Sequence, residues 1–210
     1  MVLPNVLRIP NERTTAIAPS TTAAAADVAL VRRIAAGDKS AHRELYELHG
    51  RAVLVFLACR VDDEAMAEEL LQDVMLAVWQ TAHRFGGRSA VRTWLFAIAH
   101  NTACNALRRR RPLLFGDVGM RRALDARAAT PGPGIGADQR LDLQRAMADL
   151  PDDQRTAMEL FFFHGFDLEE IGAITGAPVG TVKSRLSRAK GRMRRSLAGD
   201  GAPEGGSDVP

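Results

Sequence analysis

The segment FDLEEIGAITGAPVGTVKSRL, which runs from Phe166 to Leu186, limits the possible folds of this chain more than any other stretch. Asp167 is followed three residues later by Glu170, the spacing of a capping box in which each side chain satisfies a backbone N–H at a helix start. Phe166 before the cap and Ile171 at the fourth helical position fit a hydrophobic staple. Together these residues predict a helix that begins directly after Asp167.

The residues after this start predict a second helix that crosses the first. Gly172 is the small residue that two crossing helices need, and Gly176 can adopt the left-handed conformation of a tight turn. Pro178 suits the first turn of the next helix, on which Val182 and Leu186 can pack back against the first. This pattern is that of a helix-turn-helix, whose second helix enters the major groove of DNA.

The second helix has a basic outer face. Between Gly180 and Arg195 the chain has seven basic residues and no acidic ones. If the apolar residues pack inward, five polar or basic side chains point outward: Thr181, Ser184, Arg185, Arg188 and Arg192. Arginine can hydrogen-bond a guanine edge with two N–H groups, and serine and threonine can contact a phosphate or a base. The alternative is an ordinary amphipathic helix with a hydrated basic face, and repressors, response regulators and sigma factors all contain this motif.

The composition favours an all-α protein. Only 5% of the 210 residues are aromatic, and the apolar 46% are rich in alanine and leucine, which are strong helix formers. Apolar residues recur at helical spacing in Glu64–Trp79 and again in Ser89–Arg111. A second basic block, with seven arginines and no acid, lies between Val74 and Gly116. Two separate basic blocks indicate two contacts with one long polyanion.

Proline and glycine mark the divisions of the chain. Pro112 ends the second periodic segment, and the proline- and glycine-rich stretch after it is typical of a linker. We therefore predict two small helical domains joined by a flexible linker and flanked by disordered tails. The predicted bounds are an N-terminal tail 1–26, a first domain 27–112, a linker 113–137, a second domain 138–197 and a C-terminal tail 198–210.

Both domains resemble parts of bacterial sigma factors. The segments AEELLQDVMLAVW (67–79) and RFGGRSAVRTWLFAIAHNTACNALRRR (84–110) resemble region 2 of the sigma-70 family, and residues 150–193 resemble region 4. With these two regions and a short linker, the chain is similar to an extracytoplasmic-function (ECF) sigma factor. The resemblance implies a cytoplasmic, non-enzymatic initiation factor that binds promoter DNA and core RNA polymerase, the latter through its β′ clamp helices and β flap. It also implies an anti-sigma factor that holds the protein inactive until a stress signal arrives.

The resemblance further implies which residues contact each partner. The polar face that would bind the polymerase comprises Glu69, Gln72 and Asp73. The set that would recognise and help melt the −10 element comprises Phe85, Arg88, Arg92, Asn101, Asn105, Arg108 and Arg109. Within this set Asn101 and Phe85 would hold a flipped base, since asparagine offers a donor and an acceptor, and the arginines would hold phosphates. The set that would read the −35 element comprises Thr181, Lys183, Ser184, Arg185 and Arg188.

Nothing in the sequence indicates catalysis. We find no nucleophile–base pair, glycine-rich phosphate loop or cluster of metal ligands, and therefore expect no enzyme activity and no cofactor. His100 and Cys104 are four residues apart, a spacing that could place two metal ligands on one helix face, but no second pair is evident. Two alternatives remain open: a stand-alone helix-turn-helix regulator that binds DNA without polymerase, and an interaction module or metal-dependent enzyme built on His100 and Cys104. Two cysteines, with no signal peptide and no membrane span, indicate a reduced, cytosolic protein.

Overall fold

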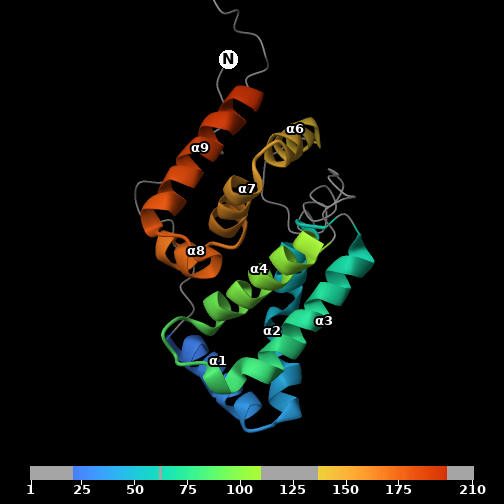
Figure 1. The fold of residues 1–210 in the computed structure, drawn as a ribbon, viewed down its shortest axis with the longest axis vertical. Helices are drawn as coiled ribbons and strands as arrows, with labels where there is room; N and C mark the ends of the chain where they lie inside the picture. Colours follow the sequence, from blue (N-terminus) through green and yellow to red (C-terminus); the bar gives the residue numbers. More distant parts are fainter. Residues whose placement is uncertain (1–20, 62, 110–136, 198–210) are drawn as a thin grey trace, which may run out of the picture.

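The computed structural model describes residues 21–61, 63–109 and 137–197, and every regular element in these ranges is helical. The predicted all-α class is therefore confirmed. The N-terminal bundle contains α1 (Thr21–Ala35), α2 (Lys39–Ala58), α3 (Glu64–Thr81), the short 3-10 turn η2 (Ala82–Arg84) and α4 (Val91–Arg109). The C-terminal bundle contains α6 (Ala137–Ala148), α7 (Asp152–Met158), the π-helical turn η3 (Glu159–Phe163), α8 (Leu168–Thr175) and α9 (Val179–Leu197). Figure 1 shows the N-terminal bundle below and the C-terminal bundle above, with α8 directly over α4.

The predicted tails and linker fall mostly outside the described residues. Residues 1–20 of the N-terminal tail, 113–136 of the linker and the whole C-terminal tail 198–210 lie there. Helix α1, however, begins at Thr21, earlier than the predicted domain start at residue 27. The reason is the run of four alanines before Asp27, because alanine has the highest helix propensity of all residues.

The N-terminal bundle is built on long amphipathic helices. The Asp38 carboxylate caps α2 by accepting hydrogen bonds from the backbone N–H groups of Ser40, at 2.8 Å, and Ala41, at 3.2 Å. The apolar run that starts at Ala52 continues α2 to Ala58. The core that α2 shares with its neighbours includes the buried side chains Leu45, Val53, Leu57, Leu70, Val74 and Leu95.

The C-terminal bundle contains the predicted helix-turn-helix, formed by α8, the turn after it and α9. Both hydrogen bonds of the capping box are present: the Glu170 N–H donates to Asp167 Oδ1 at 2.8 Å, and the Asp167 N–H donates to Glu170 Oε2 at 3.1 Å. Gly176 ends α8 in the left-handed conformation, with φ of 68°. Gly172 is fully packed, because a Cβ there would lie 2.9 Å from the carbonyl oxygen of Ala177. The capping box and the two glycines therefore produce the helix-turn-helix that the sequence predicts.

A π-helical turn, η3, widens the helix that precedes the helix-turn-helix. The His164 N–H donates to the Glu159 carbonyl oxygen, five residues back, at 3.1 Å. Such a turn adds one residue to the helix and changes which side chains face inward. Glu159 and Leu160 are buried as a result, and Gly165, with φ of 68°, then turns the chain into Phe166.

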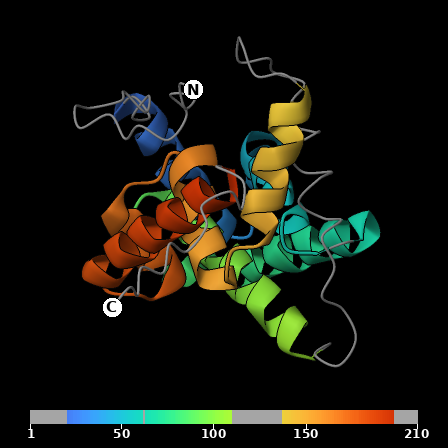
Figure 2. The same ribbon diagram turned by 90° about the horizontal axis from the view of Figure 1, so that it is seen from above.

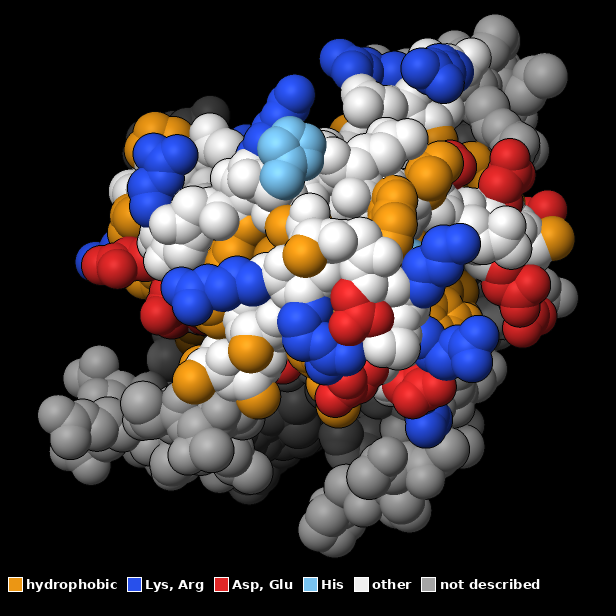
Figure 3. Space-filling view, turned by 90° about the horizontal axis from the view of Figure 1, so that it is seen from below, with side chains coloured by type: hydrophobic (Ala, Val, Ile, Leu, Met, Phe, Trp, Pro, Cys, Tyr) orange, Lys and Arg blue, Asp and Glu red, His pale blue; other side chains and the backbone are white. Residues whose placement is uncertain are grey.

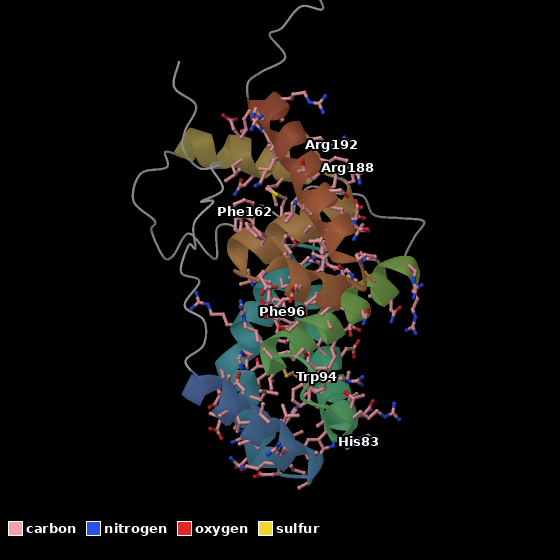
Figure 4. The ribbon with its side chains drawn as sticks, turned by 90° about the vertical axis from the view of Figure 1, so that its left-hand side faces the viewer. His83, Trp94, Phe96, Phe162, Arg188 and Arg192 are labelled. Carbon is pink, nitrogen blue, oxygen red and sulfur yellow. The ribbon has the colours of Figure 1, made fainter. Side chains whose placement is uncertain are left out.

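The two bundles pack directly on each other through a surface that we call the bundle interface. From the N-terminal bundle it comprises Phe56, Arg60, Arg92, Thr93 and Phe96, and from the C-terminal bundle Thr156, Glu159, His164, Phe166 and Glu170. Seen from above, the C-terminal bundle lies across the N-terminal one (Figure 2). The side-chain view places Phe96 at the level where the two bundles meet (Figure 4), and its ring centroid is 4.9 Å from that of Phe166.

Replacing Gly172 should test the close approach inside the helix-turn-helix. We expect Gly172→Ala to lower the free energy of unfolding by about 1–3 kcal/mol, because the added methyl group meets a backbone oxygen that cannot move independently. Urea unfolding followed by circular dichroism measures this change. Gly191→Ala is the matched control: a Cβ there meets nothing within 4 Å, so the change should be neutral or stabilise α9 by up to about 1 kcal/mol. Equal stability of Gly172→Ala and the unmodified chain would contradict the expectation.

Candidate nucleic-acid interface

Helix α9 buries one face and exposes the other, as the sequence predicts. Its inward side chains are Val182, Leu186, Ala189 and Met193, all buried. At 3.6 residues per turn, five polar or basic residues share one flank of α9 beside this buried stripe: Thr181, Ser184, Arg185, Arg188 and Arg192. Figure 4 labels Arg188 and Arg192 on this helix, and both are exposed. Lys183 is also exposed but lies on a different flank of α9, so it does not share a surface with the other predicted −35 contacts.

Hydrogen bonds hold part of this outer face in place. The Ser184 hydroxyl donates to the Thr181 carbonyl oxygen at 2.9 Å, and Arg188 Nη2 donates to Ser184 Oγ at 3.0 Å. Arg185 Nε lies 2.9 Å from Asp153 Oδ2 of α7, and the Arg185 side chain is only 24% exposed. Arg188 is thus exposed and bonded to Ser184 within α9, whereas Arg185 is held against α7.

The predicted −10 residues are arranged along α4 and the loop before it. Phe85, which follows η2, packs on Trp94 with ring centroids 5.1 Å apart. Trp94 precedes Asn101 by two helical turns, so these two residues lie on the same flank of α4, about 10 Å apart along its axis. Phe85 is half-buried and Asn101 is exposed. Phe85 is thus packed on a residue that shares the flank of Asn101.

Exposed polar side chains continue along the C-terminal part of α4. Asn105, Arg108 and Arg109 are exposed there, and Arg88 is exposed in the loop before the helix. Arg108 donates a hydrogen bond to Asn105 Oδ1, one turn away. Residues 110 and 111, which continue this arginine run, lie outside the described residues.

Arg92 has a different environment from the other predicted phosphate contacts. Its Nη2 donates to the His164 carbonyl oxygen, and its guanidinium lies 4.2 Å from the centre of the Phe166 ring. Arg92 is thus directed at the C-terminal bundle. Its role as a phosphate contact stays a prediction.

The predicted polymerase face is present on α3. Glu69, Gln72 and Asp73 are exposed on the side opposite the buried apolar stripe. Leu76 completes the same exposed face, with 55% of its surface accessible. Sequence reasoning missed Leu76, although its spacing of three from Asp73 and four from Gln72 was the available signal. Elsewhere on the N-terminal bundle, at the end seen from below, acidic and basic side chains are intermixed (Figure 3).

His100 and Cys104 do lie together but do not form part of a larger cluster of ligands. The Cys104 sulfur is 3.7 Å from His100 Nε2 and 3.9 Å from Nδ1. Within the described ranges, no group of three or more His, Cys, Asp and Glu side chains is placed to share a metal ion. Burial, and then the positive charges of Arg60 and Arg185, lower the pKa of His100 to about 4. The ring is therefore neutral at pH 7 and lies close to arginines from both bundles.

Comparison with known proteins assigns the family. Residues 45–112 match the model of sigma-70 region 2, and residues 140–193 match that of sigma-70 region 4. The ECF RNA polymerase sigma factor RpoE of Cereibacter sphaeroides is 36% identical over 182 residues, which cover 81% of this chain and 94% of that protein. The chain belongs to the ECF sigma factors of the sigma-70 family.

Solved structures of other sigma factors have the same fold. CnrH, solved in complex with the cytosolic domain of CnrY, is 25% identical with a TM-score of 0.60, and the match covers 83% of this chain and 99% of CnrH. RpoE of Bartonella quintana, solved with the anti-sigma factor NepR, is 28% identical with a TM-score of 0.57, and the match covers 75% and 97% of the two chains. In this sigma factor, region 2 thus spans most of α2 and all of α3, η2 and α4. Region 4 spans most of α6, all of α7, η3 and α8, and most of α9.

None of the helices in the described part of this sigma factor has the length and apolar character needed to cross a membrane.

The neutral state of His100 gives a prediction for pH dependence. In the folded chain His100 should titrate near pH 4, whereas in the unfolded chain it takes up its proton near pH 6.5. Because the unfolded chain then binds more protons between these values, the contribution of His100 to stability is complete above pH 6.5 and falls as the pH drops toward 4. Titration of the histidine ring protons by NMR, assigned with a His100→Gln variant, measures the midpoint. A midpoint at 6.5 would show that the ring is hydrated in the folded protein.

Proposed function

We propose that this sigma factor brings core RNA polymerase to promoters by contacting two DNA elements, the −35 element through α9 and the −10 element through α4. The observation that carries the proposal is the outer face of α9, where Thr181, Ser184 and Arg188 follow a correctly capped helix-turn-helix. Arg188 would contact a base edge or a phosphate, and the two hydroxyl groups would fix the position of the helix on the DNA backbone. Region 4 would then use the major groove, as helix-turn-helix proteins do.

Region 2 would recognise the melted −10 element. Asn101 is exposed and can offer both a donor and an acceptor to the edge of an unpaired base. Phe85 packs on Trp94, two turns before Asn101 on α4, and would supply an aromatic face for stacking. Arg88, Arg108 and Arg109 would neutralise phosphates near them, which makes the contact sensitive to salt.

The polymerase and an anti-sigma factor are the proposed protein partners. The exposed α3 face formed by Glu69, Gln72, Asp73 and Leu76 would bind the β′ clamp helices, since it combines acidic groups with one apolar side chain. The β flap would bind region 4. The two solved relatives were both captured with a regulatory protein, which supports control of this chain by an anti-sigma factor. The protein would act in the cytoplasm by binding alone, without catalysing a reaction.

Run-off transcription with purified core polymerase tests this function directly. We expect the chain to confer initiation at a defined start site on a subset of promoters in a library, because each region is proposed to contact its own DNA element. Gel-shift experiments with and without core polymerase distinguish this function from that of a stand-alone regulator. Specific duplex binding by the chain alone, with no effect on start-site choice, would contradict the proposal and favour that alternative.

A pair of arginine variants tests the recognition face of α9. Arg188→Ala should reduce −35-dependent transcription by roughly 5- to 150-fold, which corresponds to about 1–3 kcal/mol for a bidentate base contact. Arg194→Ala is the matched control, because Arg194 is equally exposed on the same helix but lies on another flank. Promoter strength is measured by abortive initiation at fixed salt. An equal loss in both variants would indicate a general effect of charge instead of recognition by this face.

A further inference from the structure

One apolar side chain of the helix-turn-helix stays exposed in the folded chain. Val179, the first residue of α9, keeps 43% of its surface accessible. It is the one large apolar side chain left exposed among those that the structure describes in the C-terminal bundle. Its packed side faces α8, because Val179 Cγ2 lies 3.8 Å from where a Cβ on Gly172 would be. The rest of its surface is open to a partner outside the bundle.

The next residue, Gly180, is a glycine without a reason inside the fold. Its φ is not positive, unlike that of Gly176, and a Cβ at Gly180 would meet nothing within 4 Å, unlike one at Gly172. Glycine within a helix is less favourable than alanine, so this residue weakens α9 without any gain in packing. Glycine also lets a backbone come close to a ligand. We therefore attribute the missing Cβ to something that approaches α9 from outside the chain.

The chain carries no charge around these two residues. Every residue between Glu170 and Lys183 is uncharged, and the cations of α9 begin at Lys183 and continue to Arg195. Phosphates attract cations, whereas the major groove presents base edges, on which the 5-methyl group of thymine is an apolar feature. The start of α9 thus has the chemistry of a contact to bases. The cations that follow along the helix have the chemistry of contacts to phosphates.

We propose that Val179 is a specificity-determining residue of region 4, which contacts the 5-methyl group of a thymine in the −35 element, and that Gly180 allows α9 to come close enough for this contact. The inference rests on the proposed function, because it requires α9 to enter the major groove. In helix-turn-helix proteins the first residues of the recognition helix contact base edges. The Val179 side chain leans in that direction, since Cα–Cβ bonds in a helix tilt toward its start. Thr181 of the proposed −35 set lies in the same turn, so Val179 would extend that interface.

Removing one methyl group from the DNA tests the contact. Deoxyuridine lacks only the 5-methyl group of thymidine, and it replaces each thymine of the −35 element in turn, on either strand of a promoter recovered by run-off transcription. Initiation by the full chain with core polymerase should fall about fourfold at one position, which corresponds to about 0.8 kcal/mol for one buried CH₂ group. The same replacement should have little effect on Val179→Ala. An equal response of both proteins, no response of the unmodified chain, or an element without any thymine would overturn the proposal.

A glycine variant tests the close approach separately from folding. Gly180→Ala should keep or increase the stability of the chain, because the new methyl group meets nothing within it. It should nevertheless lower −35-dependent initiation by roughly fivefold or more, since the methyl group would be overpacked against the DNA. Gly191→Ala is the matched control, equally free of contacts within the chain but about 16 Å further along α9. Equal initiation by the two glycine variants would overturn the proposal. Circular dichroism checks folding, and Gly180→Ala carries the test if Val179→Ala has lost its helices.

Failure of the proposed function would give a different result from failure of this inference. If the chain confers no −35-dependent initiation, Arg188→Ala has no effect either, and the proposed function itself is contradicted. If Arg188→Ala lowers initiation while deoxyuridine and Gly180→Ala do not, α9 binds the promoter without using Val179. In that case only the role of Val179 and Gly180 is overturned.

Discussion

The arrangement of the two bundles depends on the joint burial of Arg60 and Glu159. Burial raises the pKa of Glu159, whereas the charge of Arg60 opposes that shift by favouring the ionised carboxylate. Desolvating such a pair costs several kcal/mol per ion, and only close contact and additional hydrogen bonds offset this loss. Arg60 obtains them from Phe56, Glu159 and Thr156. Glu159 Oε1, by contrast, has no hydrogen-bond partner among the described residues, so the hydrogen bonds offset only part of the cost of burying this carboxylate.

The same contacts link packing between the bundles to the geometry of the DNA-reading helices. Glu170 accepts a hydrogen bond from the Asp167 N–H, which starts α8, and another from Thr93 of α4. Gly172, two residues after Glu170 in α8, allows the turn before α9 to approach closely. A helix that is capped, packed and oriented in this way holds α9 at a defined angle. The interface therefore rests on the same helix that positions the recognition face.

Local features could be predicted from the sequence, and contacts between distant segments could not. The capping box at Asp167, the left-handed Gly176 and the buried stripe of α9 follow from signals within a few residues of one another. Arg60 and Glu159, in contrast, are separated by 99 positions, and an arginine after an apolar helix carries no signal of its partner. The resemblance to region 2 implies a phosphate contact for Arg92, but nothing near it in the sequence indicates its hydrogen bond to the His164 carbonyl oxygen. The π-helical turn that buries Glu159 has no recognisable sequence pattern either.

A polar contact between the bundles has a physical consequence that an apolar one would lack. When an interface of leucines and phenylalanines opens, all of the buried area is exposed to water at about 25 cal/mol per Å². When the Arg60–Glu159 pair opens, both ions regain their hydration, which returns most of the free energy spent on their burial. The aromatic rings of Phe96 and Phe166 still favour closure, but the ion pair limits its strength. The strength of the contact between the bundles is therefore set by its aromatic rings, and the ion pair mainly fixes which residues meet.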